Sequence, residues 1–206
     1  MYNIFIECDI MKKASFKKRA LAYIIDMFIV SVIISVMSYN INTTKIDKLN
    51  KEADSLMKDY VNGEVSTDKY IKDFASINYD ISRESSVNTG IYLVVCIGYF
   101  LVFQYLNDGA SIGKKLVGIK IVSNDNKKVS FLQMFIRTSI VNDIINNSMI
   151  LILIYMTSNM NYFIGYGIIN FICNLFVIVC IFMIIYRKDK LALNDIMSKS
   201  YVMEVK

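Results

Sequence analysis

Residues 20–39 read ALAYIIDMFIVSVIISVMSY, a stretch in which Asp26 is the only charged side chain. A helix of this length is long enough to cross the hydrocarbon core of a bilayer. A carboxylate inside such a helix costs about 2.5–3.5 kcal/mol on insertion scales and normally faces a partner or a water-filled cavity. The stretch therefore predicts a membrane-spanning helix that carries a candidate functional residue.

Three further stretches have the length of a span, and they cover residues 89–106, 138–158 and 162–186. The chain is 55% hydrophobic with a mean hydropathy of +0.43, as expected for a protein with four membrane spans. Residues 138–158 form the least regular stretch, because its first half is polar. The alternative for that half is a helix lying in the membrane interface. We expect an all-α membrane protein, a bundle of about four transmembrane helices.

The basic residues are distributed unevenly between the segments outside the spans. With the N-terminus inside, the inner segments hold 16 Lys and Arg against 7 acidic residues, whereas residues 40–88 hold 7 basic and 9 acidic ones. Because basic loops stay in the cytoplasm, both termini are predicted to be cytoplasmic. The same balance indicates contact with anionic lipid and gives no indication of nucleic-acid binding.

Residues 40–88 form an outer loop that is too long for a simple connector. Apolar residues recur in it at helical spacing, first in residues 46–60 and then in residues 70–77. Thr44 suits the start of the first helix, Asn62-Gly63 breaks it, and Ser66 or Thr67 suits the start of the second. We predict an extracytoplasmic helical hairpin, either a cap on the outer ends of the spans or a docking site for a protein partner at residues 44–81.

The inner loop, residues 107–137, is rich in glycine and lysine. Gly109, Gly113 and Gly118 permit tight bends or close helix approach, and the run IKIV after them reads as a short strand. Ser130 suits the start of the helix that leads into the third span. The glycine spacing does not match a phosphate-binding P-loop.

The residue inventory gives no support to an enzyme. The chain has no His, and its four cysteines (Cys8, Cys96, Cys173 and Cys180) form no metal-ligand pair. They read as small apolar residues in the core. We expect no catalytic residue, no metal and no cofactor. Residues 20–39 show no signal-peptide cleavage site, and translation from Met1 or from Met11 remains open.

Three segments together resemble the RDD family of bacterial membrane proteins, which is named for one Arg and two Asp. They are RALAYIID (residues 19–26), GASIGKKLVGIKIV (109–122) and LNDIMSKSYV (193–202). The resemblance assigns the signature residues as Arg19, Asp26 and Asp195 and implies a single membrane domain over residues 12–203, with the hairpin as an insertion.

The chain departs from the family pattern at two positions. Asn194 stands where the family typically has His, and Ser200 stands where it has Thr. Members are described as transporters, with sodium/proton antiport proposed for some. The resemblance implies a multi-pass protein of the bacterial cytoplasmic membrane, while family membership alone does not fix function.

The depth of the polar residues suggests that some of them form a cluster within the membrane. At a rise of 1.5 Å per residue, Asp26 lies about 10 Å beyond Arg19 and Asp143 about 9 Å beyond Arg137, so both carboxylates are expected at one level. Asn142 and Asn146 add amide groups there. The group could bind a monovalent cation or share a proton. The alternative is a structural cluster in which each Asp pairs with an Arg or Lys from the interface.

Two functions follow from these patterns. The first is a small transporter or transporter subunit for a proton-coupled cation or a small solute, working as a homo-oligomer because four spans enclose little volume. The second is a non-transporting accessory or immunity-type protein that acts through its outer hairpin. Asp195 is expected to fold back with the tail and to close a salt-bridged cluster with Arg19 and the lysines at 114 and 115.

Overall fold

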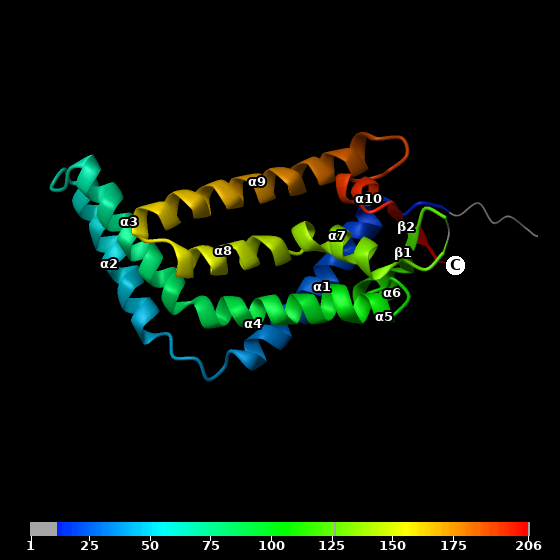
Figure 1. Ribbon diagram of the computed structural model, residues 1–206, viewed down its shortest axis with the longest axis horizontal. Helices are drawn as coiled ribbons and strands as arrows, with labels where there is room; N and C mark the ends of the chain where they lie inside the picture. The colour runs from blue at the N-terminus through cyan, green and yellow to red at the C-terminus, as the bar shows by residue number, and fades with distance from the viewer. Residues whose placement is uncertain (1–11, 126, 206) are drawn as a thin grey trace, which may run out of the picture.

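The computed structural model describes residues 12–125 and 127–205. Long helices run beside one another, with a small sheet at one end of the bundle and a helical hairpin at the other (Figure 1). We refer to these as the sheet end and the hairpin end. The helices are α1 (Phe16–Met37), α2 (Thr44–Val61), α3 (Thr67–Glu84), α4 (Ser86–Cys96), α5 (Gln104–Leu106), α6 (Ile112–Val117), α7 (Phe131–Val141), α8 (Ile144–Met156), α9 (Asn159–Tyr186) and α10 (Leu193–Met197).

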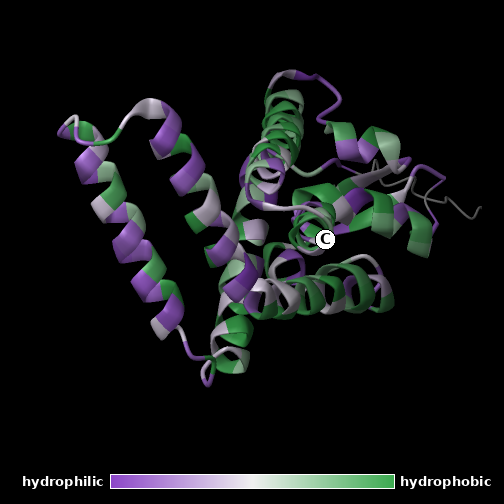
Figure 2. Ribbon diagram, turned by 60° about the vertical axis from the view of Figure 1, so that its left-hand side comes forward, coloured by the Kyte–Doolittle hydropathy of each residue, from purple (hydrophilic) through white to green (hydrophobic). Residues whose placement is uncertain are grey.

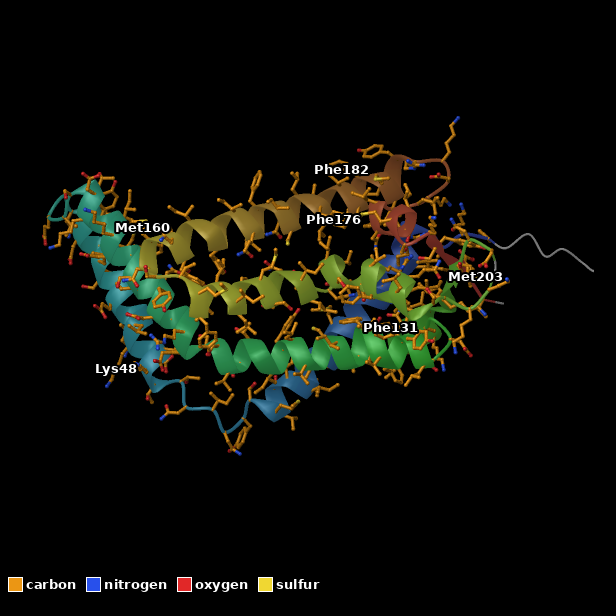
Figure 3. All side chains as sticks on the ribbon, viewed as in Figure 1. Lys48, Phe131, Met160, Phe176, Phe182 and Met203 are labelled. Atoms are coloured by element: carbon orange, nitrogen blue, oxygen red, sulfur yellow. The ribbon has the colours of Figure 1, made fainter. Side chains whose placement is uncertain are left out.

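Three of the described helical segments are long and apolar enough to span a membrane. They are α1, the continuous helix over Ser86–Leu106, and α9. The second of these consists of α4, the π-helical segment η1 (Ile97–Phe103) and α5. Most α9 residues are exposed, and its side chains stand out from the bundle, Phe182 among them (Figure 3). Such a surface is suited to lipid contact, since apolar side chains there meet no aqueous phase.

The expected third span is not one straight helix. Its residues fall in α7 and α8, which are bent by 68° where they meet, so the pair is a broken span or a re-entrant segment. Asp143 sits at the break with φ of +55°, a left-handed conformation that Asp adopts more readily than most residues. The break falls within the polar first half of residues 138–158, so that Thr138 belongs to α7 and Asn146 to α8. The pair counts as the fourth span of the bundle if the two bent helices cross the membrane together.

The sheet end holds a two-stranded antiparallel sheet that the all-α expectation did not include. Strand β1 (Ile119–Ser123) lies where the IKIV run predicted a strand, and it pairs with β2 (Ser200–Glu204), which was not predicted. Lys13 forms an isolated bridge with Met203, so the segment before α1 joins the same assembly. A buried apolar cluster under the sheet includes Ile119, Ile121 and Val202.

The hairpin end consists of α2 and α3, which pack on each other. Figure 2 shows alternating polar and apolar positions along them, whereas the spans are mostly apolar. Helix α3 packs on the ends of the spans: the Tyr79 hydroxyl donates to Ile154 O at 3.1 Å, and Phe74 contacts Phe163 edge-on. Helix α2 contributes no buried residue. The hairpin therefore caps the bundle through α3, while α2 is the outer helix.

The helix starts of the structure lie at or beside the predicted residues. Ser130 caps α7 in a capping box with Gln133, and α3 begins after Ser66, as expected. Helix α2 has Thr43 at its N-cap position, one residue before the predicted Thr44, and the Thr43 side chain makes no capping hydrogen bond. The cysteines Cys96, Cys173 and Cys180 are free and buried. Cys8 and both candidate start residues, Met1 and Met11, lie outside the described residues.

Candidate functional site

The buried carboxylate of Asp26 is bound by donors from two other segments. Tyr99 in η1 donates its hydroxyl to Oδ1 at 2.6 Å, Ser111 donates its hydroxyl to Oδ2 at 2.5 Å, and the Gly113 N–H donates to Oδ1 at 2.7 Å. Asp26 is fully buried. Because hydrogen bonds to a charged group are stronger than neutral ones, these three donors offset much of the cost of burying the carboxylate.

The local sequence around α6 explains how these donors converge. Ser111 caps the helix by accepting from the Lys114 N–H, and Gly118 ends it in the left-handed conformation with φ of +70°. Gly113 faces α1 so closely that a Cβ there would lie 2.3 Å from Ala22 O. The glycines of the inner loop thus allow the backbone of α6 to reach the carboxylate.

Lys114 completes this group, which we call the Asp26 cluster (Asp26, Tyr99, Ser111, Gly113 and Lys114). Its ammonium lies 3.9 Å from Asp26 Oδ2, 3.3 Å from Gln104 Oε1 and 3.4 Å from Ser111 Oγ. These contacts are long for an ammonium group. Burial lowers the pKa of Lys114 to about 8, although the Asp26 carboxylate acts in the opposite direction.

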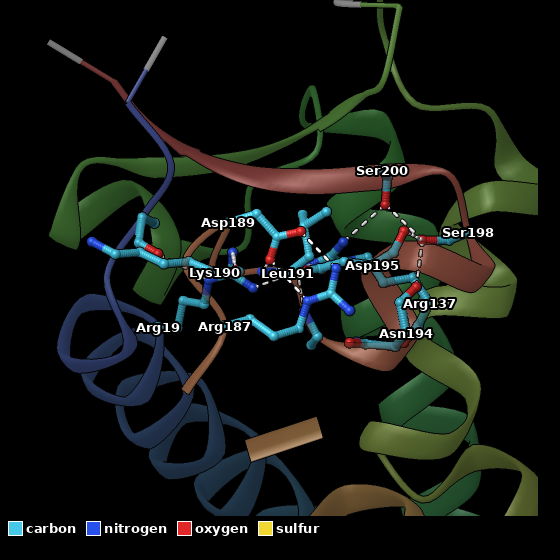
Figure 4. Close-up of polar contacts among 12 residues, drawn as sticks. Arg19, Arg137, Arg187, Asp189, Lys190, Leu191, Asn194, Asp195, Ser198 and Ser200 are labelled. Atoms are coloured by element: carbon cyan, nitrogen blue, oxygen red, sulfur yellow. Dashed lines mark hydrogen bonds and ion pairs between the residues drawn. The ribbon is translucent and has the colours of Figure 1, made fainter. Parts of the chain in front are cut away.

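A second cluster lies at the sheet end, around the fully buried Asp195. Arg19 Nη1 lies 2.7 Å from Asp195 Oδ2, and Arg137 Nη2 lies 2.5 Å from Oδ1 (Figure 4). The Ala192 N–H also donates to Oδ2 at 3.0 Å. Burial alone raises the pKa of Asp195, but the guanidinium groups of Arg137 and Arg19 outweigh it and hold the pKa below its ordinary value.

The two arginines of this Asp195 cluster (Arg19, Arg137, Asp195 and Ser200) are held by further acceptors. Arg19 donates from Nε to Ala14 O at 3.2 Å and from Nη2 to Lys190 O at 3.0 Å. Arg137 donates from Nη1 to Ser200 Oγ at 2.8 Å (Figure 4). The cluster therefore joins α1, α7, α10 and β2, elements that are far apart in the sequence.

A cavity of about 300 Å³ lies between the two clusters. Helix α1 contributes Phe16, Ala20 and Ile24 to its walls. Helix α9 contributes Val177, Ile181 and Ile184. Arg19, Lys114 and Arg137 also line it, and among its described lining residues there is no Asp or Glu. The cavity therefore combines apolar walls with three basic side chains.

The structure gives Asp26 and Asp143 different surroundings. The carboxylate of Asp26 accepts from Tyr99, Ser111 and Gly113, whereas Asp143 lies at the break before α8, and a site shared by the two carboxylates stays a prediction. Asn146 donates to Asn170 Oδ1 at 3.2 Å, and Asn142 lines the cavity. The depth predicted for Asp143 assumed one straight helix, whereas α7 and α8 are bent by 68° at this residue.

Asp195 was expected to contact Arg19, Lys114 and Lys115, and among the described residues only the contact with Arg19 is found. The contact between Arg19 and Asp195 is present, but Lys114 pairs with Asp26, and Lys115 hydrogen-bonds to Asn107. Arg137, from which the depth of Asp143 was counted, pairs with Asp195.

Sequence reasoning missed Tyr99 and Ser111 as members of the Asp26 cluster, and it assigned Lys114 to the cluster of Asp195. It named Ser200 only as a position of the family pattern, without a partner. Ser111 and Lys114 stand within the glycine-rich block, so the block itself was a signal for them. Tyr99 lies in an apolar span, and the π-helical turn that aims it is not visible in composition. Such π-helical turns often occur at functional sites.

The model of the RDD family matches residues 13–199, which is most of the chain. The chain belongs to the RDD family. Arg19, Asp26 and Asp195, the residues that the resemblance singled out, all lie in the two clusters of this RDD protein. The matched range runs across the hairpin, which the motif-based comparison had left outside. No curated protein and no solved structure is significantly similar to the chain.

Proposed function

We propose that this RDD protein is a small membrane transporter, or the membrane subunit of one, with its substrate site in the cavity between the two clusters. The observation that supports the proposal is the cavity itself, which lies between apolar helices and is lined by the signature residue Arg19. Its volume lies at the lower end of the range of ligand sites, which suits a small solute or one end of a larger one.

We place the sheet end in the cytoplasm of a bacterial cell. The segments at this end carry the excess of Lys and Arg, which favours the cytoplasmic side of the cytoplasmic membrane. On this orientation the hairpin is extracytoplasmic, and the cavity lies in the inner half of the bilayer. A homo-oligomer remains a prediction of the transport function.

The charge distribution favours a neutral or anionic solute over a cation. Both oxygens of Asp26 already accept hydrogen bonds, and the side chains that face the cavity include three basic groups and no acidic one. A cation would meet repulsion at these groups. The proton-coupled cation transport considered from sequence therefore has less support than transport of another solute.

Asp26→Asn does not provide a clean test of transport. The three donors that converge on the carboxylate would face an amide group instead, so loss of function could follow from loss of the fold. A change that fills the cavity and leaves both clusters intact separates the two effects.

The test is Val177→Phe, with Val179→Phe as its matched control. Val177 lines the cavity, whereas Val179 is exposed on the outer side of α9 and is absent from the lining. Both proteins would be reconstituted at equal folded amounts, and fluxes of protons, sodium, potassium, chloride and phosphate would be followed with indicators inside the vesicles.

We expect flux in the wild type and in Val179→Phe, and at least a tenfold loss in Val177→Phe. Equal flux in both variants would place the pathway elsewhere. Wild-type vesicles no more permeable than empty ones to every solute of the panel would contradict transport of protons and of these inorganic ions.

The accessory function is supported by a different observation, the exposed surface of α2. Val61 near the hairpin tip is 72% exposed, and no residue of α2 is buried. A photo-crosslinking side chain at Val61 should give a discrete adduct in cells if a partner docks there. A diffuse smear, equal to that from a crosslinker at Glu64, would count against this function.

A further inference from the structure

The basic side chains of the cavity outnumber the carboxylates that neutralise them. Arg19 and Arg137 share Asp195, and Lys114 is paired with Asp26. Three positive charges and two negative ones leave one positive charge in excess, and both carboxylates lie behind the basic groups, outside the cavity lining. The surface that a ligand would meet is therefore cationic.

Lys114 is the basic group best placed to bind an added anion. Its side chain is 19% exposed, and its ammonium lies 3.9 Å from the nearest carboxylate oxygen. An anion at the cavity end would approach this ammonium together with the guanidinium edges of Arg19 and Arg137. Lys and Arg together are typical of sites for phosphate groups.

The walls of the cavity identify what accompanies the anionic group. Ile24 on α1 and Ile181 on α9 both line the cavity and are 64% and 40% exposed, so the cavity opens on the apolar surface of the bundle. A free phosphate would have to lose water against these walls. Acyl chains that leave through the same opening would gain apolar contact and remain in the bilayer.

We propose that the cavity binds the phosphate group of an anionic phospholipid, with Lys114, Arg19 and Arg137 around the phosphate and the acyl chains passing between α1 and α9. The inference rests on the proposed function, since it names the substrate class for the same cavity. The cavity then takes the polar group and its first chain carbons, and the remainder of the lipid stays outside.

The chain has no tryptophan, so one introduced indole is a unique fluorescent reporter. Ile181→Trp places it at the cavity opening. Phe182→Trp, next along the chain, places it on a side chain that is 55% exposed and is not part of the lining (Figure 3). Each protein would be reconstituted in phosphatidylcholine vesicles that contain brominated phosphatidylglycerol, and in others that contain the same amount of brominated phosphatidylcholine.

At position 181 we expect brominated phosphatidylglycerol to quench at least twofold more than brominated phosphatidylcholine. At position 182 the two lipids should quench equally. In the Ile181→Trp background, Lys114→Met should remove the preference, while Lys114→Arg and Lys115→Met should keep it. Lys115 is exposed and outside the lining, which makes it the matched control.

Equal quenching by the two lipids at position 181 would overturn the proposal, and this comparison leaves Lys114 intact, so it does not depend on whether Lys114→Met folds. Inorganic phosphate should not relieve the quenching more than chloride does at the same ionic strength. Relief by phosphate alone would overturn the proposal of a bound lipid and would indicate a site for a soluble anion. The measurement needs no gradient. A lipid preference without movement of labelled phosphatidylglycerol between the two leaflets would contradict the transport function alone, and flux of a panel solute without a lipid preference would contradict the lipid alone.

Discussion

Gly113 donates its backbone N–H to Asp26 Oδ1 at 2.7 Å, and the space between α6 and α1 leaves no room for a side chain. A Cβ on Gly113 would lie 2.3 Å from Ala22 O and 2.7 Å from Asp26 Oδ1. The position therefore needs glycine for the close approach of two backbones, and it does so without a positive φ.

Gly113→Ala should destabilise the protein by about 1–3 kcal/mol, the usual cost of forcing an extra methyl group into a packed site. The atoms that it meets belong to backbone and to a buried carboxylate, which cannot move aside freely. Thermal unfolding in detergent would measure the loss. Gly167→Ala is the control, because nothing lies within 4 Å of its Cβ position. Equal stability of the two variants would contradict the close approach.

Asp195→Asn should be among the most damaging single changes, with a cost of about 3–5 kcal/mol, because it leaves two buried guanidinium groups without a counter-charge. Its yield in membranes and its unfolding temperature in detergent should both fall. Asp189→Asn removes the carboxylate of an exposed ion pair with Arg187 and should change neither. A stable Asp195→Asn protein would show that the two arginines find other acceptors.

Tyr99→Phe should destabilise the protein by about 1.5–3 kcal/mol, since it removes one of the hydrogen bonds to a buried carboxylate. Ser111 and Gly113 would still hold Asp26, so the fold should survive. Chemical unfolding in mild detergent would measure the change. Tyr155→Phe removes an exposed hydroxyl contact with Ser86 and should be neutral. If both variants unfold like the wild type, the hydrogen bond from Tyr99 to Asp26 does not stabilise the fold.

Lys114 should make stability depend on pH. Its pKa is about 8 in the folded protein because of burial, against an ordinary value of 10.5. Between these two values the unfolded chain binds more protons than the folded one, so the free energy of unfolding rises with pH across this window. Below about pH 8 both states are protonated, and the cost of the buried ammonium is present in full.

Lys114→Met should flatten this rise, and Lys115→Met should leave it unchanged. Unfolding free energies measured in detergent at several values from pH 7 to pH 10.5 would test both variants. A profile for Lys114→Met that still rises like the wild-type one would assign the titration to another group.

The apolar spans were predictable because their length and composition are set by the bilayer rather than by tertiary contacts. Helix α1, the helix over Ser86–Leu106 and α9 all begin and end within a few residues of the predicted stretches. The strand at Ile119–Ser123 was also visible in its β-branched run. Its partner β2 was not, because Ser200–Glu204 has no pattern of its own and pairs only through the fold.

The partners of the buried charges could be predicted only in part. Arg19 and Asp195 were expected to meet, and they do. The depth of Asp143 was predicted for a straight helix, whereas Asp143 adopts a left-handed conformation at the break between α7 and α8. The contact of Arg137 with Asp195 joins α7 to α10, and depth along one helix contains no information about such a contact.

The backbone contact between Ala14 and Val202 has a consequence for the order in which the molecule is assembled. Ala14 N donates to Val202 O at 2.9 Å, and Arg19 and Asp195 lie 176 residues apart in the chain. The first helix must therefore enter the membrane long before its partners on β2 and α10 have been synthesised. During that interval Arg19 and Arg137 lack the carboxylate that later joins them. Closure of the sheet end is a late event, and a chain that stops before α10 would remain open there with two unmatched charges.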